Sequence, residues 1–119
     1  MKLRRLGHVN LSVDDVARAQ AFYGEVLRLE PAPRPPETGR PGCWFRLGDV
    51  ELHISQESGA DNAGSGRHVA FEVEGLDELR GALVAAGVPV AEGRPAAGMR
   101  RFFARDPAGN RLELYELLP

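Results

Sequence analysis

Two six-residue stretches decide the fold of this chain: His8-Val-Asn-Leu-Ser-Val13 and His68-Val-Ala-Phe-Glu-Val73. In both, apolar side chains fall on every second residue, which is the period of a β-strand with one face packed on a core. Each stretch begins with histidine and precedes a segment whose apolar residues recur at helical spacing. The chain therefore starts the same strand–helix pattern twice, and the second start comes 60 residues after the first.

The two helices are predicted from apolar spacing and from their end signals. Asp14 or Asp15 can cap the first helix, whose apolar positions precede a stop at Leu29-Glu30-Pro31. The second helix is predicted over residues 76–86 and ends at Gly87. The apolar positions of the first helix are Val16, Ala19, Phe22, Tyr23 and Val26.

Further strands follow each helix. Residues 31–42 contain five prolines and two glycines, so any strand there must be short, irregular or at a sheet edge. We expect this segment to form a loop near the mouth of a pocket. The remaining strands are predicted over residues 43–47, 50–55, 88–92, 101–105 and 111–117. Gly48-Asp49 and Asp106-Pro-Ala-Gly-Asn110 supply the turns between the paired strands.

The chain thus contains two βαβββ modules, about 1–57 and 66–119, inside one domain of 119 residues. The polar residues 56–67 form the boundary. Leu112-Glu113-Leu114 matches Val50-Glu51-Leu52 at an offset of 62 residues, which supports an internal duplication. The predicted fold class is α+β, with the tandem modules forming a curved, partly closed sheet around a metal or ligand cleft.

Composition limits the partners. A net charge of -2 gives no broad basic field for nucleic acid, so a small-molecule ligand is expected. His8, Asn10 and Ser12 interrupt the N-terminal segment before an apolar span could form, so no membrane partner is expected. The single Cys43 cannot form an internal disulfide, which favours a reducing compartment. We expect a cytoplasmic protein.

The polar strand faces contain the candidate site. If the sheets curve together, two imidazoles and two carboxylates line one cleft, and burying them is costly unless water, mutual pairing or a metal ion satisfies them. A metal ion is the most economical of the three. His8, His68 and Glu113 make a two-histidine, one-carboxylate set, and Glu51 adds a fourth ligand. Such ligands suit one divalent ion: Ni, Zn, Mn, Co or Fe.

Other residues on these faces have open roles. His53 shares a face with Glu51 and could replace it as ligand, act as an acid or base, or line the pocket; Asn10 and Tyr115 are candidates for substrate binding. In the alternative reading of the ligand set, His8 is an ordinary hydrogen-bonded residue, and Glu51 and Glu113 lie on solvated sheet faces. Arg111 could meet an anionic substrate, although we expect it to reach solvent. Arg100 and Arg101 could be a mobile anion contact or surface charge, and we expect surface charge. The aromatic candidates for pocket walls or core, most of them expected in the core, are Trp44, Phe45, Phe102 and Phe103.

Four motifs resemble the vicinal oxygen chelate superfamily of glyoxalases, bleomycin-resistance proteins and extradiol dioxygenases. They are Gly7-His-Val-Asn-Leu-Ser-Val13, Ala19-Gln-Ala-Phe-Tyr23, Arg67-His-Val-Ala-Phe71 and Asp106-Pro-Ala-Gly-Asn-Arg-Leu-Glu-Leu114. The resemblance implies metal ligands from the first and last strand of each module, here His8, Glu51, His68 and Glu113. It also implies a homodimer.

The resemblance further implies a glyoxalase-like lyase or isomerase, in which a metal stabilises an enolate while Glu51 or Glu113 moves a proton. Three alternatives stay open. An Fe(II) extradiol-type dioxygenase needs free coordination positions, so a coordinating Glu51 counts against it. An antibiotic-modifying transferase would use the same ligands. A metal-free drug-binding protein would need none of them.

Overall fold

The computed structural model describes residues 1–36, 39–96 and 98–119. The predicted order of elements is confirmed in both halves. The first half contains β1 (His8–Val13), α1 (Val16–Ala21), a π-helical turn η1 (Phe22–Val26), β2 (Glu30–Ala32), β3 (Gly42–Leu47) and β4 (Val50–Gln56). The second half contains β5 (His68–Glu72), α2 (Leu76–Ala85), β6 (Val90–Glu92), β7 (Met99–Arg105) and β8 (Arg111–Leu117).

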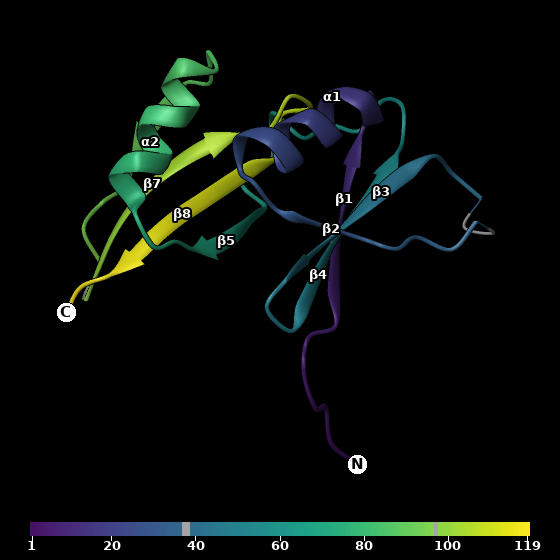
Figure 1. Ribbon diagram of the computed structural model, residues 1–119, viewed down its shortest axis with the longest axis horizontal. Coiled ribbons are helices and arrows are strands. Elements are labelled where there is room, and N and C mark those ends of the chain that lie inside the picture. Colours follow the sequence, from purple (N-terminus) through teal and green to yellow (C-terminus); the bar gives the residue numbers. More distant parts are fainter. Residues whose placement is uncertain (37–38, 97) are drawn as a thin grey trace. The chain divides into compact units, whose positions relative to one another are not determined.

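Each half forms its own compact unit, Met1–Ala60 and Asp61–Pro119. The strand order is β1-β4-β3-β2 in the first unit and β5-β8-β7-β6 in the second (Figure 1). In both, the first strand runs parallel to the last, and the other neighbours are antiparallel. The α+β class and the tandem modules are confirmed, but the sheets are separate and open, not one partly closed sheet.

The pairing register corrects one predicted equivalence. His8 lies opposite Glu51, and His68 lies opposite Arg111, so both pairs are separated by 43 residues. The offset between the halves is therefore 60 residues for the paired first and last strands, and His53, not Glu51, is the counterpart of Glu113. Burial agrees, because His53 is 8% exposed and Glu113 is 7% exposed. The predicted offset of 62 was wrong because it matched similar residues without regard to backbone pairing.

Each helix packs its apolar face on its own sheet. Asp15 caps α1 as one of the two predicted candidates, because its Oδ1 accepts a hydrogen bond from Arg18 N at 3.1 Å. Helix α1 packs on β3 and β4, and α2 packs on β6 and β8. The first core contains Val13, Ala19, Phe22, Tyr23, Phe45, Leu52 and Ile54; the second contains Phe71, Leu76, Leu83, Phe102, Ala104, Leu112 and Leu114.

Turn chemistry fixes the ends of several elements. After α2, Gly87 has φ 78, Val88 N donates to Leu83 O, and Gly87 N donates to Val84 O, which is a Schellman motif. The proline-rich segment begins in the three-residue edge strand β2, which is short and at a sheet edge as predicted, and ends at Gly42, the first residue of β3. Glu37 and Thr38, within the predicted loop, lie outside the described residues.

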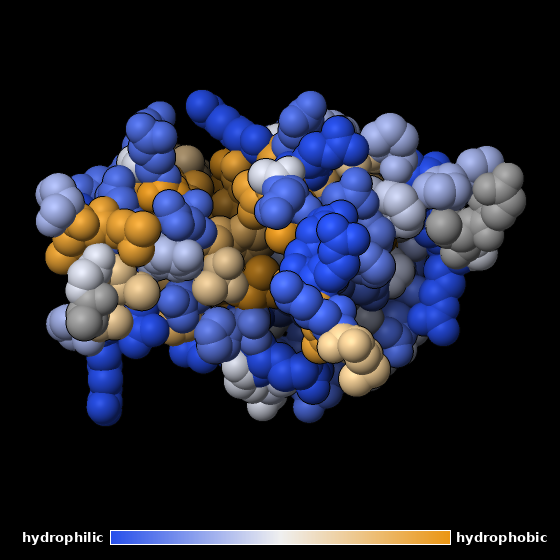
Figure 2. Space-filling model, turned by 90° about the horizontal axis from the view of Figure 1, so that it is seen from below, coloured by the Kyte–Doolittle hydropathy of each residue, from blue (hydrophilic) through white to orange (hydrophobic). Residues whose placement is uncertain are grey.

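The face in Figure 2 is mostly hydrophilic, with smaller apolar areas. No helix in the described ranges is long and apolar enough to cross a membrane.

Candidate functional site

The first half gathers three rings on neighbouring strands. Trp44 of β3 stacks on His53 of β4 with centroids 3.8 Å apart, and His53 stacks on His8 of β1 at 4.1 Å. The register places Trp44 and Asn10 on either side of His53, because β4 lies between β1 and β3. The stack therefore holds both imidazoles of this half in fixed orientations.

Glu51 lies beside this stack. Its Oε1 accepts a hydrogen bond from His53 Nε2 at 2.9 Å, and its Oε2 lies 3.6 Å from Arg46 Nη2. The hydrogen bond from His53, followed by the charges of His53 and Arg46, lowers the pKa of Glu51 from its usual 4.5. The carboxylate therefore stays ionised at neutral pH.

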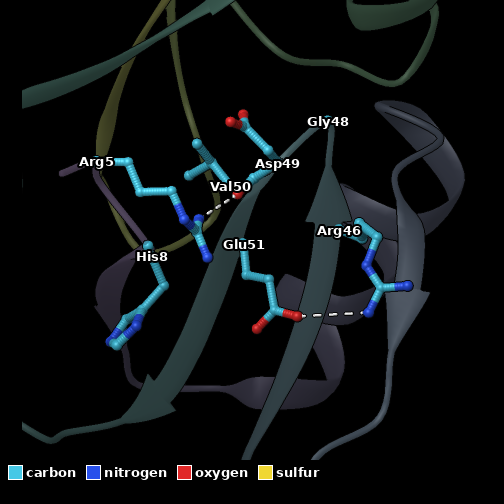
Figure 3. A pocket seen from close by; sticks show the side chains of 8 residues that line it. Arg5, His8, Arg46, Gly48, Asp49, Val50 and Glu51 are labelled. Carbon is cyan, nitrogen blue, oxygen red and sulfur yellow. Dashed lines mark hydrogen bonds and ion pairs between the residues drawn. The ribbon is translucent and has the colours of Figure 1, made fainter.

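His8 and Glu51 line a cavity of about 430 Å³ (Figure 3). In this view the Glu51 carboxylate turns toward Arg46, with His8 on its other side. Arg5 Nη1 donates to the Asp49 carbonyl oxygen at 2.8 Å and so closes part of the wall. The cavity gives a ligand access to both side chains.

The second half brings His68 and Glu113 together. His68 Nε2 lies 3.3 Å from Glu113 Oε1, and the Glu113 side chain is only 10% exposed. His68 Nδ1 lies 3.1 Å from the Gly66 carbonyl oxygen. Because that oxygen can only accept, Nδ1 carries hydrogen, and Nε2 is left to face the carboxylate.

This arrangement fits the binding of a divalent ion. Two ligand atoms about 2.1 Å from the same ion lie roughly 3.0 to 3.4 Å apart at octahedral or tetrahedral angles. The 3.3 Å between His68 Nε2 and Glu113 Oε1 matches that separation. The hydrogen bond from His68 Nδ1 to the Gly66 carbonyl oxygen also fixes the orientation of the ring, as such a bond does for histidines that bind metal ions.

The predicted four ligands occur as two separate groups, one in each unit. Within the part of the chain that the structure describes, no cluster of three or more His, Cys, Asp or Glu side chains has the spacing of a metal site. His8 and Glu51 are ladder partners in the first unit, and His68 pairs with Glu113 in the second. Each group combines an imidazole with a carboxylate, the donor types that divalent transition-metal ions bind.

Three residues whose place at the site was left open lie beside the candidate ligands. Trp44 stacks on His53, and Phe103 contacts His68 edge to face at 5.8 Å. Their neighbours Phe45 and Phe102 face the core, so strand alternation was the signal that separates them. Arg101 Nη1 lies 3.5 Å from Glu113 Oε1. Arg101 on β7 pairs with Tyr115 on β8, two residues beyond Glu113, so its long side chain can reach the Glu113 carboxylate.

The other predicted residues have ordinary contacts. Asn10 is exposed and its Nδ2 donates to Ser55 Oγ at 2.9 Å. Tyr115 is half-buried on β8, two residues beyond Glu113. Arg100 is a surface residue, as expected, and its Nη2 lies 2.5 Å from Asp77 Oδ1.

The fold and these histidine–carboxylate pairs define a class of small proteins built from tandem βαβββ modules. Residues 5–114 match the family model described as Glyoxalase/Bleomycin resistance protein/Dioxygenase superfamily. The chain belongs to this superfamily, as its motifs indicated.

Individual relatives differ in activity. A glyoxalase family protein from Bacillus anthracis is 34% identical, with a TM-score of 0.87 over 98% of both chains. Lactoylglutathione lyase from Agrobacterium tumefaciens is 28% identical, with a TM-score of 0.76 over 97% of this chain and 95% of that one. Mitochondrial methylmalonyl-CoA epimerase from Bos taurus is 33% identical over 88 residues, 63% of this chain and 50% of the bovine protein. This chain therefore spans about half the length of that curated relative.

Proposed function

We propose that this protein is a metal-dependent isomerase or lyase that moves a proton on a carbon next to a carbonyl group. The observation that carries the proposal is the His68–Glu113 pair, in which His68 Nε2 lies 3.3 Å from the buried Glu113 carboxylate and the histidine tautomer is fixed by the Gly66 carbonyl oxygen. The similarity to an epimerase and to a lyase of the same superfamily supports this reaction class.

We propose His8, His53, His68 and Glu113 as the metal ligands. His53 takes the fourth place that the sequence assigned to Glu51, because His53 shares the register position and the burial of Glu113. Three imidazoles and one carboxylate suit Zn, Ni, Co, Mn or Fe(II).

Glu51 is then the proton acceptor. It is ionised, it lines a cavity, and His53 Nε2 is its hydrogen-bond donor. If His53 Nε2 bound a metal ion, it would no longer donate a hydrogen bond to Glu51, and the Glu51 carboxylate would be free to accept a proton. A bound divalent ion would supply Lewis acidity that stabilises negative charge on the substrate oxygen.

The proton balance is simple. The substrate C–H bond breaks, its electron pair moves to the carbonyl oxygen as an enolate, and Glu51 takes the proton. Return of a proton to the same carbon gives an epimer. When that carbon carries a hydroxyl group, the intermediate is an enediolate; return of the proton to the neighbouring carbon, with loss of the hydroxyl proton, then gives an isomer in which the carbonyl group has moved. No outside oxidant or reductant is required.

Metal titration tests the ligand assignment. Protein stripped with a chelator is titrated calorimetrically with Zn²⁺, Ni²⁺, Co²⁺ and Mn²⁺. We expect near one ion per chain for the wild type and a loss of about 100-fold or more in affinity for His68→Ala. Glu72→Gln is the matched control, since Glu72 is exposed on the same strand. Equal affinity of His68→Ala and wild type would remove the assignment.

A second pair of variants separates the two candidates for the fourth ligand. His53→Ala should weaken metal binding, and Glu51→Gln should retain it. The reverse result would return Glu51 to the ligand set.

One observation favours a second candidate function, a metal-free small-molecule receptor. Arg101 lies 3.5 Å from Glu113 Oε1 and can neutralise that carboxylate without a metal. Failure of every ion to bind would support this function and reject the enzyme.

A further inference from the structure

Arg111 is a cation held in place without an anionic partner. Its guanidinium lies over the Phe103 ring, 3.9 Å from the centroid. Within the described residues, no carboxylate forms an ion pair with it. A planar guanidinium stacked on a ring keeps its edge N–H groups available for two parallel hydrogen bonds. This edge is the typical binding surface for a carboxylate, phosphonate or phosphate.

Arg111 lies next to the proposed metal ligands. It is the ladder partner of His68, and Phe103 contacts both side chains. Glu113 follows two residues later on the same strand face. An anionic group at Arg111 would therefore place the rest of a small molecule beside His68 and Glu113.

The duplication makes the charge of Arg111 notable. Its register counterpart in the first half is Glu51, so the two halves carry opposite charges at the same place. Glu51 has Arg46 and His53 as partners, whereas among the residues that the structure describes Arg111 has the Phe103 ring and no carboxylate. The second half therefore differs from the first in presenting an unpaired cation.

A cavity of about 420 Å³ lies at this arginine. Its wall combines apolar side chains with two guanidinium groups and contains no carboxylate. Arg105 is already occupied, because its Nη1 donates to Gly109 O at 2.8 Å and to Asn62 O at 3.4 Å. Arg111 is the cation left for a ligand. The lining residues are Pro89, Val90, Ala91, Phe103, Ala104, Arg105 and Arg111.

We propose that Arg111 is a specificity-determining residue that binds the anionic group of an amphipathic substrate, with Phe103 as its platform. The apolar wall of the cavity takes the uncharged body of the same molecule. This inference rests on the proposed function in one respect: it names the substrate class of that site as small organic anions.

The test uses phenylphosphonate and benzoate as anionic probes and benzamide as the neutral probe of similar size. Each is titrated calorimetrically into the full chain after removal of metal, so that binding to a metal ion cannot contribute. We expect the wild type to prefer the anions, and Arg111→Met to bind them about tenfold more weakly or worse. Arg94→Met is the control for net charge, because Arg94 is an exposed residue of the same half.

Arg111→Lys separates recognition from folding. It keeps the charge but loses the planar fork, so we expect an anion affinity between those of the wild type and Arg111→Met. Circular dichroism checks that both variants are folded. If the wild type shows no preference for the anions, or if Arg111→Met binds them as tightly as wild type, the inference is overturned.

Metal titration of the same proteins distinguishes failure of the proposed metal-dependent reaction from failure of the proposed role of Arg111. Metal uptake without anion binding would overturn the role of Arg111 and leave the proposed enzyme standing. Anion binding that depends on Arg111, in a chain that takes up no metal, would support Arg111 and reject the metal-dependent reaction.

Discussion

Glu51 and His53 share one hydrogen bond. We propose that Glu51 accepts the substrate proton and that His53 binds the metal ion. We predict that Glu51→Gln will slow proton exchange by at least about 100-fold while metal uptake is retained, because glutamine cannot accept the substrate proton. The measurement is deuterium incorporation from D₂O into a panel of α-oxo thiol adducts and acyl thioesters, followed by NMR. Glu72→Gln again serves as the control. Unchanged exchange in Glu51→Gln would move the base to Glu113.

The same carboxylate should contribute to stability in a pH-dependent way. Its pKa in the fold is lower than its usual 4.5, first because of the hydrogen bond from His53. The ionised form therefore favours the fold above about pH 4.5, and this contribution is lost as the pH falls through the lower folded pKa.

Urea unfolding of wild type and Glu51→Gln checks this sign. We expect the wild type to be more stable at pH 7, and the difference to shrink by pH 3. The effect should be small, because the Glu51 side chain is partly exposed and solvent screens it. A difference that grows on acidification would contradict the assigned cause.

Among the elements, α2 offers two glycines with opposite requirements. Gly87 has φ 78 in the Schellman motif, whereas Gly81 lies inside the helix with open space at its Cβ position. We predict that Gly87→Ala will lower the free energy of unfolding by about 1 kcal/mol and that Gly81→Ala will raise it by a similar amount. Thermal and urea unfolding measure both. Equal signs for the two variants would be inconsistent with this geometry.

Alternation and turn residues were sufficient to predict the strands, because one face of each strand packs on a helix. They were not sufficient for the end of the first helix. Leu27 N donates to Phe22 O in the π-helical turn η1, and the apolar spacing of Phe22, Tyr23 and Val26 also suits an α-helix.

The site was predictable only in part for a related reason. His8, His68 and Glu113 could be placed on strand faces, but their neighbours depend on which residues lie opposite across a ladder. The similar triplets Val50-Glu51-Leu52 and Leu112-Glu113-Leu114 suggested one register, but the backbone adopts another. The equivalence of His53 with Glu113, and of Glu51 with Arg111, was therefore not predicted. Long side chains such as Arg101 reach their partners through torsions that strand periodicity does not determine.

For the whole molecule, the two separate cores predict a local response to a core defect. Leu83 is fully buried in the second unit. We expect Leu83→Ala to lower the free energy of unfolding by about 2 to 5 kcal/mol. Hydrogen exchange should accelerate in α2 and β8 more than in β4. Equal acceleration in both halves would show that the two cores open together.

The parallel pairing of the first and last strand in each half also governs the order of events during synthesis on the ribosome. β1 cannot complete its pairing until β4 has left the exit tunnel, and the same holds for β5 and β8. The nascent first half can therefore close its sheet while the second is still being translated. Contacts this distant in sequence form slowly. Until β4 and β8 have been synthesised, the backbone groups of β1 and β5 stay unpaired. Because unpaired strand edges are prone to aggregate, a chaperone would be most useful during this interval.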